Sequence, residues 1–402
     1  MQTKPKKVVI GLSGGVDSSV AAYLLKQQGY KVVGLFMKNW HDTTGLLKAD
    51  CPWLDDRFDA EAVSRKLKIP LHYVDLSEQY SKRVVEYMFS EYEKGRTPNP
   101  DVLCNREIKF DVFMENAFKL GADYVATGHY CRKKEIIING QTVFRLLAGN
   151  DLNKDQSYFL CQLSQNQIEK VLFPIGDINK SEVRKIASEL KLVTAHKKDS
   201  QGICFVGKVD LPTFLQQKLS AKTGDVLLVP IDSHIFNRKW KEVSLNIDDE
   251  TLLELSGAYS FSLNETKKIG EHRGAHFYTV GQRKGINIGG FAEPLFVLAT
   301  DVNSNQIFMG MGSEHPGLFR RVLKINNNEI NWLRNDYKLN INQTKRFKVR
   351  IRYRQPLQEA FLMQRKNGLF ILFDELQRGI TPGQFAVWYE NDELIGSGVI
   401  QE

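Results

Sequence analysis

The stretch SGGVDSS, residues 13–19, has the residue types and spacing of a phosphate-binding turn. It stands between the β-branched run Val8–Ile10 and the apolar-periodic run Val20–Leu25, an order that predicts a strand, a tight glycine turn and a helix start. At such a junction the first N–H groups of the helix point outward together, and Gly14 and Gly15 let the backbone approach a bulky anion. No lysine follows the glycines, so a Walker-type grip on a γ-phosphate is not expected.

The polar side chains of this turn take the place of that lysine. We interpret Ser13, Ser18 and Ser19 as phosphate ligands, and Asp17 as an outer partner of Mg²⁺ or as an acceptor at the helix end. A glycine turn alone is more often structural than functional. The whole SGGVDSS string resembles the PP-loop of the ATP pyrophosphatase superfamily, whose members cleave ATP between the α- and β-phosphates and attach AMP to a substrate oxygen.

Composition narrows the class of protein. The 402 residues are enough for two or three domains, and 55 Lys and Arg against 47 Asp and Glu give a net charge of +8. A basic balance favours a polyanionic partner, although many basic proteins bind no nucleic acid. No apolar run approaches a membrane span and the N-terminus lacks a signal sequence, so we expect a soluble cytoplasmic protein with no membrane partner. The five cysteines lack C-x-x-C spacing and should be reduced thiols, without a metal site.

The first half of the chain alternates apolar strands with amphipathic helices, which predicts a doubly wound parallel sheet. Met37 and Gly128 follow expected strands, at the edge where open α/β sheets hold ligands. The expected elements are strands at Lys31–Lys38, Leu71–Leu76 and Asp123–Thr127, a hairpin at Glu135–Leu147, and helices at Asp55–Leu67, Ser77–Lys94 with a serine N-cap, Lys109–Leu120 and a helix from an Asn179/Glu182 capping box to Leu190.

The segment Gly95–Phe110 reads as a turn-rich loop around Cys104. Its polar, basic surroundings, with Arg106 and Lys109, would raise the thiolate fraction of Cys104, and we favour a reactive thiol over a buried inert one. A second cysteine, Cys204, lies near Gly202 after two lysines. Cys131 and Cys161 lie in apolar surroundings and are interpreted as packing residues.

The second half has a different pattern. Residues 232–268 are polar without a clear period, and 270–290 combine many glycines with basic residues, as in an RNA surface or a turn-rich small domain. From Leu295 onward the pattern is all-β. In Lys345–Arg354, strict alternation would put five Lys and Arg side chains on one face, which we interpret as a phosphate-backbone contact; a solvated edge strand is the alternative.

Together, an ATP site, two candidate reactive cysteines and a basic β-region fit one chemistry. A carbonyl oxygen of RNA is a poor leaving group, so it is first adenylated, and sulfur carried on a cysteine then displaces AMP. A persulfide would deliver the sulfur, and a second cysteine would resolve it by forming a disulfide.

Motifs from end to end of the chain strengthen this interpretation. SGGVDSS, FMKNW, GRTPNPDVLCNREIKF, ATGHY, KDQSYFL, DSQGICFVG, FYTVGQRKG, RYRQ and TPGQ stand in the order seen in the bacterial tRNA-specific 2-thiouridylases, which the chain resembles. The resemblance implies ATP-dependent conversion of the wobble uridine of the Lys, Glu and Gln tRNAs to 2-thiouridine, with Mg²⁺ accompanying ATP. It also implies a cysteine desulfurase or a sulfur-carrier protein as sulfur donor.

The resemblance also implies roles for individual residues. Cys104 would be the nucleophile and resolving thiol, Cys204 the persulfide carrier, and Asp17 part of the catalytic site. ATP would be bound by Gly11, Leu12, Ser13, Gly14, Gly15, Val16, Asp17, Ser18, Met37 and Gly128. The target uridine would be held by Asn99, Pro100 and Asp101, and tRNA contacted by His129, Lys154, Asp155, Gln156, Arg352, Tyr353 and Gln384.

The expected fold is α/β: a PP-loop domain with a doubly wound parallel sheet at 1–208, a small mixed tRNA-contacting domain at 209–294 and a C-terminal tRNA-binding β-barrel at 295–402. The main alternative function is a PP-loop ligase or amidotransferase that adenylates a small molecule. A third is a noncatalytic RNA-binding protein with ATP as a structural ligand, in which both cysteines would be inert.

Overall fold

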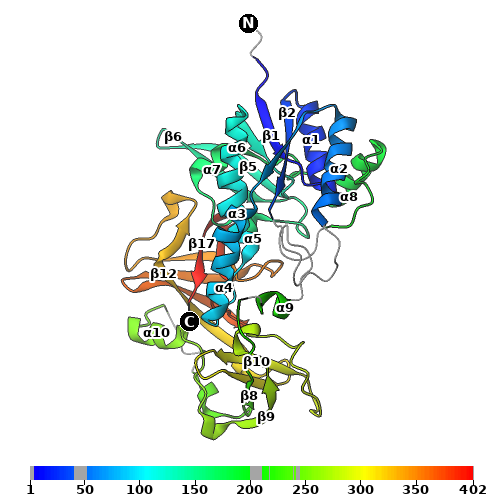
Figure 1. Cartoon of the computed structure of the whole chain (residues 1–402). Coiled ribbons are helices and arrows are strands. Elements are labelled where there is room, and N and C mark those ends of the chain that lie inside the picture. The colour runs from blue at the N-terminus through cyan, green and yellow to red at the C-terminus, as the bar shows by residue number, and fades with distance from the viewer. Residues whose placement is uncertain are drawn as a thin grey trace.

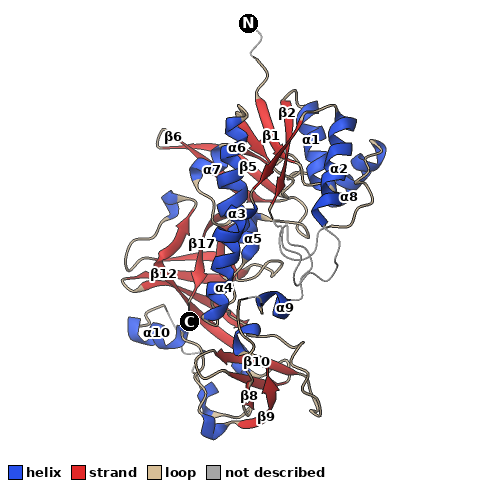
Figure 2. Cartoon of the chain, viewed as in Figure 1, coloured by secondary structure: helices blue, strands red, loops and turns tan. Residues whose placement is uncertain are grey.

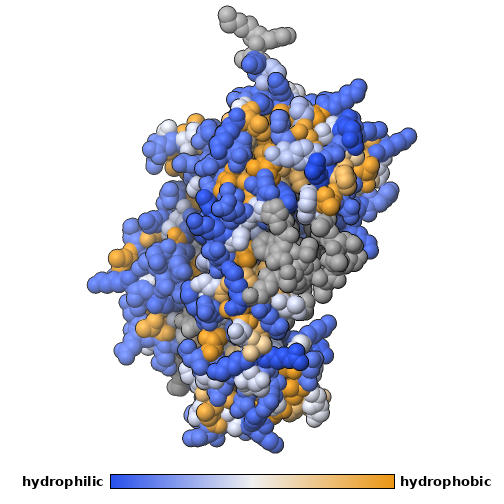
Figure 3. Space-filling model, in the orientation of Figure 1, coloured by the Kyte–Doolittle hydropathy of each residue, from blue (hydrophilic) through white to orange (hydrophobic). Residues whose placement is uncertain are grey.

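A computed structural model describes residues 4–39, 52–199, 211–216, 218–238, 240 and 245–401. Figure 1 shows an N-terminal sheet at the top, a barrel in the middle and a smaller sheet at the bottom. The face in Figure 3 is largely hydrophilic, with hydrophobic residues in separate patches. Across the described part of the chain, no helix has the length and apolar character needed to cross a membrane.

The N-terminal sheet is parallel, with strand order β3-β2-β1-β4-β7. Helices cover both of its faces, so the predicted doubly wound sheet is confirmed (Figure 2). One face packs against α1, α2 and α8, and the other against the helices between β3 and β4. The strands are β1 (Lys7–Gly11), β2 (Lys31–Lys38), β3 (Leu71–Asp75), β4 (Tyr124–Ala126) and β7 (Val171–Leu172), and the three helices are α1 (Val16–Gln27), α2 (Pro52–Leu67) and α8 (Lys180–Glu189).

The helices between β3 and β4 differ from the predicted ones at two places. The expected helix from Ser77 is a continuous run that includes a π-helical turn, but its N-cap is Leu76 and not a serine. The expected loop up to Phe110 is wrong, because helical structure already begins at Pro100, after the N-cap Asn99. The elements are α3 (Ser77–Tyr80), η1 (Ser81–Val85), α4 (Glu86–Glu93), α5 (Pro100–Leu103), η2 (Cys104–Val112) and α6 (Phe113–Lys119).

The predicted hairpin is present as β5 (Cys131–Ile138) and β6 (Gln141–Ala148), followed by η3 (Ser157–Leu160) and α7 (Gln165–Glu169). The predicted capping box of α8 is wrong: Asn179 makes no side-chain cap bond. Instead the carboxylate of Asp151 accepts the N–H of Lys180 at 3.0 Å.

A four-stranded sheet with the order β10-β11-β8-β9 forms the lower part of Figure 1. Two of its strands precede and two follow residue 294, where we predicted the end of the central domain. Its strands are β8 (Gly224–Leu228), β9 (Lys267–His272), β10 (Leu295–Asp301) and β11 (Gln306–Met311). The described helices between β7 and β12 are α9 (Leu211–Leu215), η4 (His234–Phe236), α10 (Asp249–Ser256), η6 (Leu263–Glu265), η7 (Ala275–Phe277) and η8 (Pro316–Leu318), of which α10 packs against the barrel strands.

The C-terminal strands form a closed antiparallel barrel, because β12 pairs with both β15 and β17. Strand β17 also pairs with β6, at Leu394 and Leu146, so the N-terminal hairpin extends the barrel sheet. The elements are β12 (Phe319–Trp332), η9 (Asn335–Tyr337), β13 (Thr344–Arg350), β14 (Gln358–Arg365), β15 (Gly368–Arg378), β16 (Phe385–Glu390) and β17 (Glu393–Ile400). The predicted strand to Arg354 was too long, since β13 ends at Arg350.

Candidate functional site

The glycine turn between β1 and α1 has the backbone of an anion site. Gly14 has a φ of +72°, and a Cβ there would collide with the backbone of Asp56. Gly15 is the extended N-cap of α1. The hydroxyl of Ser18 accepts the N–H of Ser13 at 3.2 Å and donates to the carbonyl of Gly15 at 3.1 Å, which fixes the turn. The first N–H groups of α1 therefore stand at the carboxyl edge of the sheet, as the sequence predicts.

The other residues predicted to bind ATP lie around this turn. A Cβ on Gly128 would lie 2.8 Å from the nitrogen of Ser18, so the backbone after β4 runs directly against the first turn of α1. A Cβ on Gly11 would lie 3.9 Å from Cε of Met37, which is 8% exposed at the end of β2. The fold thus brings together Gly11 with Met37, and Gly128 with the glycine turn.

Gly128→Ala is expected to weaken ATP binding about tenfold or more, the scale of a misplaced binding group. Its methyl group would push against the backbone of Asp17 and Ser18. Gly289→Ala is the matched control, because nothing lies within 4 Å of a Cβ there. Calorimetric titration with Mg-ATP measures both variants. Equal dissociation constants would show that the contact with Gly128 does not shape the site.

Asp17 belongs to a charged cluster that sequence reasoning missed. Its carboxylate accepts from Nζ of Lys180 at 2.8 Å and from the hydroxyl of Tyr130 at 2.7 Å. Lys180 also pairs with Asp199 at 2.7 Å, and Lys154 does so at 2.7 Å. Burial and the Asp17 carboxylate raise the pKa of Tyr130 far above its ordinary value.

The two lysines of the cluster favour the ionised form of Asp199. Partial burial alone would raise the pKa of Asp199, but the bonds from Lys154 and Lys180 outweigh burial and lower that pKa to about 2. The cluster therefore joins the phosphate turn to the predicted tRNA residue Lys154 and to the start of the segment that carries Cys204. Cys204 itself lies outside the described residues.

Cys104 does not lie in the polar loop that we expected. It has 0% exposure, follows α5 and belongs to the apolar cluster that contains Met37, Val102 and Phe113. The expected basic neighbour Arg106 is paired with Glu107 at 2.7 Å and with Gln162 at 3.1 Å. The expected loop was wrong because the helix starts at Pro100 and buries Cys104.

The other described cysteines have the predicted packing role. Cys131 and Cys161 are buried, and both are free thiols like Cys104. Burial raises the pKa of Cys161 to about 12 and that of Cys131 well above its ordinary value. Both thiols are therefore protonated at neutral pH and unsuited to nucleophilic attack.

The residues predicted to hold the uridine stand at the start of α5, which leads to Cys104. The Asn99 side chain accepts the N–H of Val102 at 3.2 Å, Pro100 is the first residue of the helix, and the carbonyl of Asp101 accepts from Asn105 at 3.0 Å. The amide of Asn99 also donates to Gln384 at 3.3 Å. Two predicted substrate residues separated by most of the chain are therefore in contact.

The segment Lys154–Gln156, which we call the KDQ segment, connects the phosphate turn to the barrel. Lys154 pairs with Asp199, and Gln156 accepts the N–H of Tyr130 at 3.0 Å. Asp155 is 5% exposed and forms an ion pair with Arg350 of β13. Each of these side chains has a protein partner in this structure.

The remaining predicted tRNA residues differ in accessibility. His129 is buried between Phe110 and Phe173 and bonds to Thr127 at 2.8 Å. Burial, with a smaller effect of Lys109, lowers the pKa of His129 well below its ordinary value, so the ring is neutral. Arg352 is exposed and donates to the carbonyl of Arg378, and Tyr353 packs on Phe159 with ring centroids 4.3 Å apart.

Three side chains of the predicted basic face of the barrel have carboxylate partners, and a contact of this face with a phosphate backbone stays a prediction. Arg346 pairs with Glu359 and Asp374, Lys348 pairs with Glu359, and Arg350 is buried against Asp155. Beyond Arg350 the strand has ended, so the remaining basic residues do not continue the face. Carboxylates from other segments therefore pair with the Lys and Arg side chains for which the sequence predicted a phosphate of RNA as the partner.

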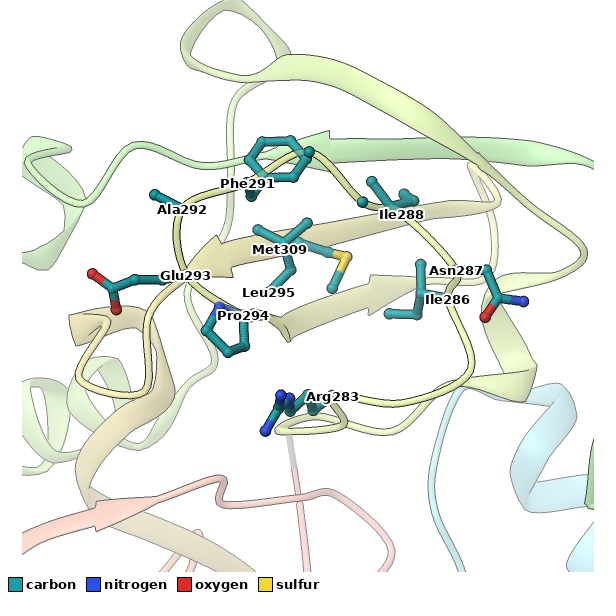
Figure 4. A pocket seen from close by; sticks show the side chains of 12 residues that line it. Arg283, Ile286, Asn287, Ile288, Phe291, Ala292, Glu293, Pro294, Leu295 and Met309 are labelled. Atoms are coloured by element: carbon teal, nitrogen blue, oxygen red, sulfur yellow. The ribbon is translucent and has the colours of Figure 1, made fainter.

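A separate cavity of about 400 Å³ lies in the smaller sheet (Figure 4). It is formed by the glycine-rich segment 283–295 folding over Met309, and Arg283 and Glu293 are the charged residues among its described lining. The region is turn-rich, as one alternative expected, and its contact with RNA stays a prediction.

Three family models match the chain: "tRNA methyl transferase HUP domain" at 6–208, "tRNA methyl transferase PRC-barrel domain" at 257–311 and "Aminomethyltransferase beta-barrel domain" at 322–400. These descriptions name methyl transfer, whereas the curated relatives are named for thiolation. A solved 4-thiouridine synthetase in complex with RNA and ATP aligns with a TM-score of 0.32 and 18% identity over 53% of this chain and 50% of that chain, which carries no inference.

Curated relatives match over the whole chain. Proteins named tRNA-specific 2-thiouridylase MnmA from Flavobacterium johnsoniae and Christiangramia forsetii are each 59% identical over 98% of this chain and 100% of their own length. The protein of the same name from Karelsulcia muelleri is 46% identical over 100% of both chains. This identity and coverage show that the chain belongs to the family of tRNA-specific 2-thiouridylases, whose members are tRNA sulfurtransferases.

Proposed function

We propose that this enzyme uses ATP to adenylate the C2 oxygen of the wobble uridine in the Lys, Glu and Gln tRNAs, and then replaces that oxygen by sulfur. The observation that carries the proposal is the contact between the residues before the glycine turn and the helical run that contains Cys104. A Cβ on Gly11 would lie 3.4 Å from Cζ of Phe113, at the start of α6, and Phe113 and Cys104 belong to the same apolar cluster.

The ATP assignment is supported by the fit of the turn to a polyphosphate. A side chain at Gly14 would collide with the backbone of Asp56, so this position is kept bare beside the first N–H groups of α1. Asn39, two residues beyond Met37, is 2% exposed, and neither atom of its amide has a partner among the residues that the structure describes. An unpaired buried amide is costly, and the edge of an adenine ring would satisfy both atoms. Mg²⁺ would enter with ATP, and Asp17 would exchange Lys180 for the cation.

The proposed reaction has three bond exchanges. The uridine oxygen attacks the α-phosphorus and pyrophosphate leaves. The terminal sulfur of a persulfide on Cys204 attacks C2, and AMP leaves with the oxygen. The Cys104 thiolate then attacks the inner sulfur of the persulfide, which leaves 2-thiouridine and a disulfide between Cys104 and Cys204. A thiol reductant restores the cysteines, and a cysteine desulfurase or a sulfur carrier renews the persulfide.

The proposed binding roles are those that the sequence motifs imply. Residues 11–18, Met37 and Gly128 bind ATP, and Asn99, Pro100 and Asp101 hold the uridine. The tRNA is contacted by the KDQ segment, by Arg352 and Tyr353, and by His129 once the nucleic acid reaches its buried ring.

The purified enzyme with Mg-ATP, a cysteine desulfurase supplied with cysteine, a thiol reductant and an unmodified tRNA transcript is expected to produce thiolated RNA, which a mercury-containing gel retards. The band should require ATP and should disappear when the wobble uridine is replaced by cytidine. AMP release that depends on a small-molecule acceptor, without a retarded band, would instead support the ligase alternative.

A further inference from the structure

We propose that Gln384 is a positioning residue: through it, the barrel sets the loop that holds the target base. This inference rests on the proposed function, and it differs from the prediction that Gln384 contacts tRNA. The contacts that lead to it join residues 97–99, before α5, to residues 382–384, before β16.

The amide of Gln384 is used by the loop itself. Its Nε2 donates to the carbonyl of Thr97 at 2.9 Å and to that of Pro98 at 3.2 Å. Its Oε1 accepts from Nδ2 of Asn99 at 3.3 Å. Both N–H donors are therefore committed to protein carbonyls, and an RNA contact through them would have to break these bonds.

The backbones of the two segments also meet. The N–H of Thr97 donates to the carbonyl of Pro382 at 2.8 Å. Gly383 has a φ of +88°, and a Cβ there would lie 2.9 Å from the oxygen of Thr97. A third anchor comes from the segment before β10, where the hydroxyl of Thr279 lies 3.1 Å from that of Thr97. Contacts of this closeness hold the loop in one position.

The position of the loop is transmitted to Cys104 through the helix start. Nδ2 of Asn99 is held by Gln384, so Oδ1 faces α5 and accepts the N–H of Val102 at 3.2 Å. The carbonyl of Asn99 accepts the N–H of Leu103 at 3.3 Å. Cys104 follows directly. Gln384 thereby fixes the orientation of the N-cap amide and, with it, the first turn of the helix that precedes the nucleophile.

Gln384→Met tests the inference, because methionine keeps the length of the side chain and removes its amide. The matched control is Gln364→Met, a buried glutamine of β14 whose amide also makes several bonds, to Asn327, Arg365 and Gly368. We expect Gln384→Met to lower kcat for tRNA thiolation about ten- to a hundredfold, with the tRNA Kd within about twofold of wild type. The control should keep its kcat.

Hydrogen exchange of the free enzyme provides a readout that does not depend on activity. The amides of Val102 and Leu103 should exchange faster in Gln384→Met than in the wild type or in Gln364→Met. A weaker tRNA Kd with unchanged kcat and unchanged exchange would overturn the inference and identify Gln384 as an RNA contact. If the wild type fails to thiolate tRNA, the proposed function fails, while the exchange rates still decide whether Gln384 positions α5.

Discussion

Cys104→Ala is expected to lower the rate of tRNA thiolation by at least about 10³-fold, the scale seen when a nucleophile is removed. Alanine has no sulfur to attack the persulfide. ATP binding should be unchanged, because the glycine turn belongs to another segment. The mercury gel measures the rate of thiolation, and calorimetry with Mg-ATP measures the binding.

Cys161→Ala is the control for the loss of a buried sulfur. Cys161 has the same 0% exposure as Cys104, so each substitution removes one atom from a packed region, at a cost of ~1 kcal/mol. Cys161 is nonetheless unsuited to catalysis, since burial raises its pKa to about 12. The control should thiolate tRNA at nearly the wild-type rate. Equal rates for the two variants would remove Cys104 from the reaction.

The phosphate turn could be predicted from the sequence because all of its parts are local. Gly14, Gly15 and Ser18 lie within five residues, and a strand and a helix flank them in the order that the apolar runs indicate. The parallel sheet was predictable for the same reason, since β-branched runs alternate with helical patterns. These features depend on neighbours in the chain and hardly on distant contacts.

The region around Cys104 could not be read in this way. Pro98 and Pro100 suggested a stiff loop, but proline is favoured at the first position of a helix, and Asn99 before it is a good N-cap. The same residues therefore start a helix that buries Cys104. The pattern N-P-D at residues 99–101 could have predicted a helix start. It was missed because both prolines were interpreted as loop formers.

The partners of charged and amide side chains were the least predictable feature. Asp17 meets Lys180, and Asn99 meets Gln384, across 163 and 285 residues of chain. The basic pattern of β13 invited an RNA interpretation because Glu359, Asp374 and Asp155 lie on other segments. Alternation assigns side chains to faces, but only the folded barrel decides what each face meets.

Arg350→Met is expected to destabilise the protein by about 3–5 kcal/mol, the cost of breaking a buried ion pair. Arg350 and Asp155 have side chains 9% and 5% exposed, and Arg350 also donates to the hydroxyl of Tyr389 at 2.9 Å. Burial alone would lower the pKa of Arg350, but Tyr389 and Asp155 raise it overall. Methionine would leave the Asp155 carboxylate buried with only Ser157 and the N–H of Gly149 to satisfy it. Urea denaturation measures the loss.

The same variant separates the buried pair from an RNA contact. If Arg350 neutralised a phosphate, its loss would flatten the salt dependence of tRNA binding by about one unit of slope. We expect an unchanged slope together with the large loss of stability. Arg346→Met is the matched control on the same strand, where exposed pairs with Glu359 and Asp374 predict little change in stability. Adding Asp155→Asn to Arg350→Met should recover part of the lost stability, because it removes the uncompensated charge. A flatter salt dependence of tRNA binding, together with an unchanged free energy of unfolding, would identify Arg350 as a phosphate contact.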